Sequence, residues 1–461
     1  MGAILFIVIS VLVYGIKILH NSRNLTYDKW CEIFISFFIF TNCIGFGLPF
    51  IELNIPTTCG AWGLKFRLEV FMIITPFFFI VLANHKRWQL LPMPWYVLLG
   101  IILFCAINIF NPNNMSMQST IIALAQLISY IIFLYIICSS TNNNTILKAI
   151  YEGFKYTVIL EALLTICYPI LGITQVVELF RDTVSIRAEE RPGAPGTFVH
   201  PNGLGGYMAY IIAFYTSCYV MGYHKKSSLI LILLSFFVLI FTFSRTALLA
   251  TLITVITIVV IHITRNERIF TIKTIFTLIL PLILGSLALI FLTPIKNSFI
   301  GSNMDEMFLA RLLHFYCGYE TFIDHPWIGV GLNAHLEYIR HTISFGSVFG
   351  DLNNYFWQAE EFMFSHPIHN IFLIILTEMG IVGLLPVMFF FLRRFLSIKG
   401  VLRSKATQEN KVMFLFAIGL ICCLAIHGMA DWAPFTLNLR NIWILIFFAT
   451  AITKVEKEKA V

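Results

Sequence analysis

The chain has 461 residues, of which 58% are hydrophobic and 12% charged, and its formal net charge is +7. Soluble domains carry about 25% charged residues, so this composition excludes an ordinary soluble protein and predicts one that uses the bilayer as its solvent. The basic residues are scattered through short loops and form no basic domain, which argues against nucleic acid as a partner.

Apolar segments of helical length recur along the chain, each close to the ~20 residues needed to cross a bilayer. They predict an all-α integral membrane protein, a polytopic bundle of about 12 to 13 transmembrane helices. The opening segment MGAILFIVIS has no Lys or Arg before Lys17, so we interpret it as a retained first span and not as a cleaved signal peptide. The predicted spans are 2–19, 31–50, 68–83, 95–110, 119–138, 149–171, 204–222, 228–243, 247–263, 274–293, 369–391, 411–429 and the short 440–452.

The positive charges orient this bundle. Most of the 31 Lys and Arg residues fall in one set of alternate loops, which the positive-inside rule assigns to the cytoplasm. The opposite set is poor in Lys, and its arginines are predicted to face outward, where they contact either lipid headgroups or a bound anion. These outer arginines are Arg67, Arg181, Arg187, Arg191, Arg245, Arg311, Arg340 and Arg440.

The spans and loops divide the chain into five parts. Residues 1–171 are the N-terminal transmembrane helices, 172–203 an outer loop, 204–293 the central transmembrane helices with a turn at Arg245, 294–368 a large outer loop, and 369–461 the C-terminal helices with a cytoplasmic tail. The large loop contains DEMFLARLLHFYCGYETFI, which predicts an amphipathic helix lying on the membrane with Arg311 at the edge of its apolar face. That face is formed by Phe308, Leu312, Phe315, Tyr316, Tyr319 and Phe322.

The segment SHPIHN, residues 365–370, lies where the large loop re-enters the membrane. Pro367 suits a first helical turn, which places His369 and Asn370 near a helix N-terminus whose positive end favours a neutral imidazole. His369 is therefore a candidate general base, and its alternative role is to stabilise the loop through hydrogen bonds. Zinc held by His366 and His369 is disfavoured, because Pro367 interrupts their spacing and no acidic ligand is near, so we predict no metal and no cofactor.

A similar segment, ERPGAPGTFVHPNGLGGY, starts at Glu190 and again places His and Pro at a helix start. Its candidate site residues are Arg191, His200 and Asn202. Gly203, Gly205 and Gly206 remove side chains from the first helical turn, which allows either close helix packing or the approach of a bulky ligand.

Arg245 interrupts two apolar segments in FTFSRTALLA. An arginine at the centre of a span costs roughly 3 kcal/mol, so it lies at the interface or is kept to bind an anion such as phosphate or diphosphate. No Asp-x-Asp is present to hold a metal with a sugar diphosphate, which leaves that task to arginines. Glu161 and Glu378 could form an ion path, but we interpret them as buried hydrogen-bonded groups because no pair of broken spans accompanies them.

These segments together resemble the O-antigen ligase and polymerase superfamily of bacterial envelope proteins. HNIFLIILTEMGIVG, from His369 to Gly383, fits the ligase pattern of His, an amide or Ser, nine residues, Gly, two residues, then Gly, Thr or Tyr, and RTALL resembles its Arg-x-x-x-Leu element. The HPN at 200–202, the SRTA at 244–247 and the DHPWIGVG at 324–331 also resemble shared segments. The resemblance covers residues 190–430, and the extra first span is a departure, because it puts the N-terminus outside.

The resemblance implies a GT-C-like helical scaffold and a metal-independent, inverting transfer of a glycan from undecaprenyl diphosphate to an acceptor hydroxyl, on lipid A core or another glycan. The protein would lie in the bacterial cytoplasmic (inner) membrane with its active site facing the periplasm. His369 would be the catalytic base and Arg245 would hold the diphosphate. Arg191 and Arg311 are further candidates for diphosphate binding, because both flank the motifs on the outer side. His200, Asn202, His366 and Asn370 are expected to support the site.

Three alternatives stay open on the sequence alone. A polymerase that extends lipid-linked repeats would share the donor and the leaving group; the His369 to Gly383 pattern favours the ligase, whereas the length of 461 residues favours the polymerase. A polysaccharide or lipid transporter would use the outer histidines and arginines only to bind its cargo. A purely structural membrane subunit would have no effect on surface glycan.

Overall fold

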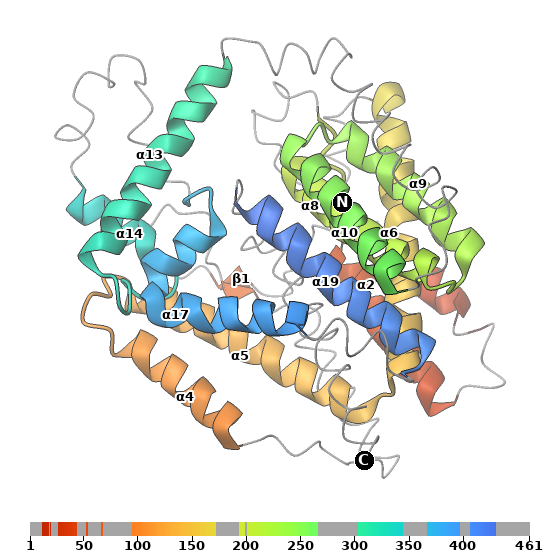
Figure 1. Cartoon of the computed structure of the whole chain (residues 1–461), viewed down its shortest axis with the longest axis horizontal. Helices are drawn as coiled ribbons and strands as arrows, with labels where there is room; N and C mark the ends of the chain where they lie inside the picture. Colours follow the sequence, from red (N-terminus) through yellow and green to blue (C-terminus); the bar gives the residue numbers. More distant parts are fainter. Residues whose placement is uncertain are drawn as a thin grey trace.

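In the computed structural model, the described residues are 12–17, 19, 26–43, 52–53, 66–67, 95–171, 193–198, 201–265, 303–343, 367–396 and 406–429 (Figure 1). The helices are α2 (Tyr27–Cys43), α4 (Trp95–Ile109), α5 (Met117–Ser140), α6 (Asn143–Leu171), α8 (Pro201–Val220), α9 (Lys225–Phe241), α10 (Arg245–Arg265), α13 (Asn303–Asp324), α14 (His335–Thr342), α17 (Ile371–Leu396) and α19 (Gln408–Gly428). Two strands of two residues each, β1 (Glu52–Leu53) and β2 (Phe66–Arg67), pair antiparallel with Glu52 opposite Arg67.

The all-α membrane fold predicted from the sequence is confirmed. Among the described helices, three are long and apolar enough to cross a membrane, at Arg245–Ile263, Ile371–Phe389 and Gln408–Gly428. The predicted spans at 68–83, 274–293 and 440–452 lie outside the described residues, so the total number of spans remains a prediction.

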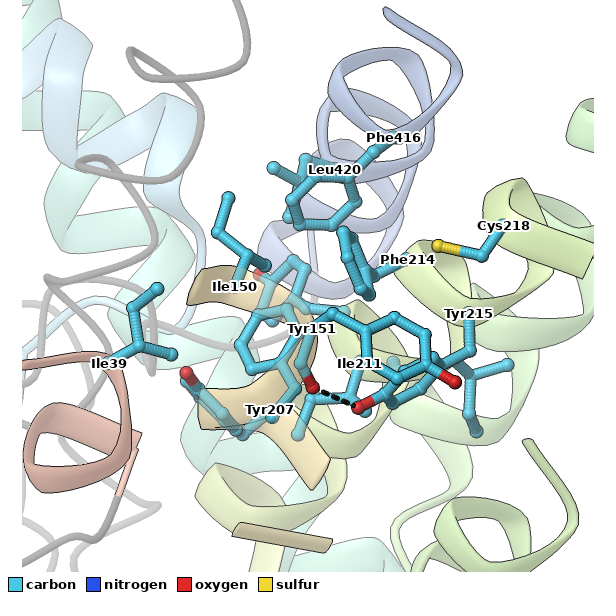
Figure 2. Packing of buried hydrophobic residues seen from close by; sticks show 14 of the residues in the cluster. Ile39, Ile150, Tyr151, Tyr207, Ile211, Phe214, Tyr215, Cys218, Phe416 and Leu420 are labelled. Atoms are coloured by element: carbon cyan, nitrogen blue, oxygen red, sulfur yellow. Dashed lines mark hydrogen bonds between the residues drawn. The ribbon is translucent and has the colours of Figure 1, made fainter. Parts of the chain in front are cut away.

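Helix α8 lies at the centre of the bundle. Every residue from Leu204 to Tyr219 is buried, as expected for a helix that is apolar all round. It packs against α9, α10 and α19, and α2 packs against α6 on the other side of the same core. Aromatic rings fill this core (Figure 2): Phe214 and Phe416 meet edge to face with centroids 4.9 Å apart, and the hydroxyl of Tyr215 donates to the carbonyl of Tyr151 at 2.9 Å. The core fixes where α8 and α10 begin.

Hydrogen bonds join segments that are far apart in the sequence and are predicted to share one side of the membrane. On the predicted cytoplasmic side, Asn143 Nδ2 donates to Asn410 Oδ1 at 2.8 Å. On the predicted outer side, Asn111 and Asn113 donate to the carbonyl of Gly329 at 3.1 and 3.3 Å. Both pairings agree with the orientation derived from the positive charges.

Helix α13 is amphipathic, as predicted. Leu312, Phe315, Tyr316 and Tyr319 are exposed, whereas the opposite face packs against α17 (Figure 1). That face is close to α17 at Gly318, where an added Cβ would lie 2.8 Å from side-chain atoms of Ile368 and Leu373. The contact of the exposed face with a membrane stays a prediction.

The predicted span at 369–391 corresponds to α17, which is long and apolar enough to cross a membrane, but this helix is broken at Gly380, whose φ of 61° and ψ of −163° are not helical. Residues 326–331 of the large loop form hydrogen bonds with the backbone groups that have no helical partner at the break. The N–H groups of Val330 and Gly331 donate to the carbonyls of Thr377 and Glu378 at 2.9 Å each. In return, Ile381 and Val382 donate to Pro326 and Trp327 at 2.8 and 3.1 Å, respectively.

Candidate active site at one end of the bundle

The turn between α9 and α10 presents Arg245. Phe243 takes a left-handed conformation with φ of 52°, which reverses the chain, and Arg245 then opens α10. The start of a helix carries a partial positive charge, which favours anions nearby. The helix N-terminus and the guanidinium group of Arg245 together suit an anionic ligand.

Helix α13 brings a second arginine to the same place. Burial and, after it, the positive charge of Arg311 lower the pKa of Arg245, which indicates that the two side chains lie near each other. Both side chains are partly exposed. Two guanidinium groups beside a helix N-terminus form an arrangement that suits a phosphate or diphosphate, whose negative charge would relieve the repulsion. The prediction that both arginines serve one site is compatible with this geometry.

His369 lies against a second histidine, His314 of α13. Their Nδ1 atoms are 3.0 Å apart, and their rings are nearly parallel, with an interplanar angle of 9°. His314 lies one helical turn after Arg311, so both side chains project from the same face of α13. A titratable imidazole and two arginines are thus gathered at one end of the bundle.

Asn370 caps α17. Its Oδ1 accepts hydrogen bonds from the N–H groups of Phe372 and Leu373 at 2.9 and 3.0 Å, and its Nδ2 donates to the carbonyl of Met429 at 3.2 Å. The expectation that Pro367 occupies the first helical turn is wrong, because the helix begins at Ile371 and the cap is Asn370. Asn370 therefore fixes the backbone that carries His369.

The start of α8 packs against the Arg245 turn. A Cβ at Gly205 would lie 2.8 Å from the Cβ of Ser244, and one at Gly206 would lie 2.9 Å from the ring of His427, so close packing is the structural reason for both glycines. Asn202 precedes Gly205 by one turn and faces the same way. Three predicted site residues, Arg191, His200 and His366, lie outside the described residues.

The family model described as O-antigen ligase matches residues 230–388, a segment that contains Arg245, Arg311, His314 and His369. This segment of the chain is therefore similar to the O-antigen ligase family. A search of curated proteins finds no match.

The O-antigen ligase match supports a ligase-like or polymerase-like function in general, and with it a glycosyltransferase-like enzyme. It also implies a lipid-linked glycan and an acceptor as substrates in general terms. Together with the apolar helices, it indicates a membrane protein.

The structure explains one glycine of the His369 to Gly383 pattern. Gly380 stands at the break of α17, where an added Cβ would lie 2.3 Å from the backbone of Trp327. The segment DHPWIGVG, residues 324–331, contacts the chain at this break. An added Cβ at Gly329 would lie 2.4 Å from the backbone of Glu378. Two motifs that lie far apart in the sequence therefore pack against each other.

Two carboxylates near this machinery are buried and hydrogen-bonded, as predicted. Glu378 lies 2.6 Å from Nδ1 of His335. Glu161 accepts hydrogen bonds from the N–H and the hydroxyl of Thr197. In α14, burial and then the charge of Asp324 raise the pKa of Tyr338, whose hydroxyl stays protonated and donates to Asp324 at 3.3 Å. These bonds hold the elements that carry the site.

His314 is the site residue that sequence reasoning missed. It lies inside the segment interpreted as an amphipathic helix, but on the face opposite the aromatic side chains. A histidine three residues after an outward-facing arginine, on the inner face of that helix, was the available signal. Within the described ranges, no group of three His, Cys, Asp or Glu side chains is arranged to hold a metal ion.

Proposed function

We propose that this protein transfers a glycan from undecaprenyl diphosphate to an acceptor hydroxyl on the outer face of the bacterial cytoplasmic membrane. The observation that carries this proposal is the position of His369, which is linked through His314 to the helix that bears Arg311, close to Arg245. A base beside two arginines suits a reaction in which a hydroxyl is activated and a diphosphate departs.

In this reaction His369 is the general base. It takes the proton of the acceptor hydroxyl while that oxygen forms a bond to the anomeric carbon of the donor sugar. The bond between this carbon and the diphosphate oxygen breaks, and its electron pair leaves with undecaprenyl diphosphate. A single displacement of this kind inverts the anomeric carbon.

Arg245 and Arg311 stabilise the leaving diphosphate. Negative charge grows on the bridging oxygen as the glycosidic bond breaks, and two fixed guanidinium groups beside a helix N-terminus oppose that charge without reorganisation. They take the place that a divalent metal would occupy, so we expect the reaction to be independent of metal. Arg191 is a third candidate for the same charge.

The remaining candidates support the acceptor and donor sugars. Asn202 lies at the start of α8 beside the Arg245 turn, and Asn370 holds the backbone of His369 through its cap. In the sequence, His200 directly precedes the start of α8, and His366 lies five residues before the start of α17. We propose that the side chains of Asn202, His200 and His366 position hydroxyl groups of the substrates, whereas Asn370 positions His369.

A ligase is favoured over a polymerase by the His369 to Gly383 pattern, in which the structure gives Gly380 a defined role. The acceptor is then lipid A core or a similar glycolipid. A polymerase would use the same donor, base and arginines, and would differ only in taking a second lipid-linked repeat as acceptor.

The test uses a deletion strain complemented with wild type, His369→Ala or the control His341→Ala. The surface glycan of each strain is separated on an SDS gel, at matched amounts of the protein in the membrane. His341 lies in α14 with its side chain 58% exposed, so its replacement should leave the ladder unchanged. His369→Ala should lose the ladder, because general-base catalysis contributes about 10²–10⁴-fold.

The fate of the glycan then separates the candidates. Full-length glycan stranded on undecaprenyl diphosphate supports the ligase, and single capped repeats support the polymerase. An unaltered ladder with His369→Ala would refute both and favour a transporter or a structural subunit.

A further inference from the structure

The contact between His314 and His369 constrains which nitrogen of each ring carries hydrogen. A hydrogen bond between two Nδ1 atoms, here 3.0 Å apart, requires one ring to donate and the other to accept. His314 is only 2% exposed and lies on the face of α13 that packs against α17, so its ring is held in place by its surroundings. The pair therefore has two possible arrangements, in which Nε2 of His369 offers a substrate either a lone pair or an N–H group.

We propose that His314 is a positioning residue that accepts a hydrogen bond from Nδ1–H of His369. This inference rests on the proposed function of His369 as the base. A neutral imidazole carries one hydrogen, so holding it on Nδ1 leaves the lone pair of Nε2 available for the acceptor hydroxyl. When Nε2 takes the proton, the imidazolium keeps donating through Nδ1 to His314, which stabilises the new charge, as hydrogen-bond partners of catalytic histidines do.

A neutral partner suits this site better than a carboxylate would. Arg311 lies one helical turn before His314, and a carboxylate at position 314 would pair with it and compete with the diphosphate. An imidazole accepts the hydrogen bond without adding negative charge. The same helix thus orients the base through His314 and presents positive charge to the leaving group through Arg311.

Two amide substitutions test the role of Nδ1. In His314→Asn, the amide can place an oxygen near the position of Nδ1, whereas the longer side chain in His314→Gln places it nearer the position of Nε2. We expect His314→Asn to keep the rate of glycan transfer within about threefold of wild type. His314→Gln and His314→Leu should lower it by about tenfold to a hundredfold, the usual effect of losing such a partner.

The rate is measured as the appearance of labelled surface glycan after induction in the complemented deletion strain, normalised to the amount of protein in the membrane. The melting temperatures of the purified variants in detergent are compared in parallel, with His341→Gln as the matched control. A merely structural role would make the rates follow the melting temperatures. Similar melting temperatures with unequal rates for the two amides support the proposal.

Equal rates for His314→Asn and His314→Gln, whether high or low, would overturn it, as would a wild-type rate for His314→Leu. His369→Ala is assayed alongside to separate the two claims. If His369→Ala keeps the wild-type rate, the proposed function fails. If it abolishes transfer while all His314 variants keep the wild-type rate, only the role of His314 fails.

Discussion

Arg245 and Arg311 illustrate how single residues favour one chemistry. Their charges repel each other, and Arg245 also lies at the positive end of α10. Such an arrangement favours the binding of a polyanion. Arginine binds diphosphate oxygens through two parallel N–H groups, whereas lysine offers a single charged centre.

We therefore expect Arg245→Lys and Arg311→Lys each to lower glycan transfer although the charge is kept. Loss of one hydrogen bond to a charged group costs about 1.5–3 kcal/mol, which corresponds to roughly a tenfold to a hundredfold drop in rate. The drop is measured as labelled surface glycan at matched membrane levels. Arg340→Lys in α14 is the control and should behave like wild type; a normal rate for both Arg245→Lys and Arg311→Lys would contradict diphosphate binding by these side chains.

At the scale of elements, the broken helix α17 supports the site. Its first half carries His369 at one end and meets the 326–331 segment at the other, through the four backbone hydrogen bonds around Gly380. Gly380 combines a positive φ with extended ψ, a conformation that is essentially restricted to glycine. Any side chain there would also contact the backbone of Trp327.

Gly380→Ala should therefore destabilise the protein by about 1–3 kcal/mol or more, seen as a lower melting temperature in detergent and less protein in the membrane. Gly100→Ala in α4 is the matched control, because nothing lies within 4 Å of the added Cβ and the position is helical. It should be neutral or slightly stabilising. A melting temperature for Gly380→Ala equal to that of Gly100→Ala would show that the break is not a required part of the fold.

For the whole molecule, hydrophobic patterning predicted the helices well where they are described. The spans expected at 204–222, 228–243 and 411–429 correspond to α8, α9 and α19 with shifts of two to three residues at most boundaries. Runs of apolar residues bounded by polar loops are sufficient for such predictions, because the bilayer imposes the length of each helix.

Long-range pairings could not be predicted in the same way. The break at Gly380 depends on backbone partners some fifty residues earlier, and the partner of His369 lies 55 residues away in α13. The φ of proline suits the first helical turn, so the sequence predicts that Pro367 lies there. In the structure, Asn370 caps the helix by accepting hydrogen bonds from two backbone N–H groups, and the helix therefore starts later. Hydrophobic patterns and motifs in a single sequence do not reveal these contacts.

The central claim is that His369 promotes release of undecaprenyl diphosphate. The most direct measurement uses purified protein in proteoliposomes. The donor is lipid-linked glycan extracted from the deletion strain, and membrane lipids supply the acceptor. Free undecaprenyl diphosphate is measured by mass spectrometry in the presence of EDTA. Wild type and His341→Ala should release it together with the joined glycan, and His369→Ala should release at least about a hundredfold less. Equal release by His369→Ala and wild type would contradict the claim.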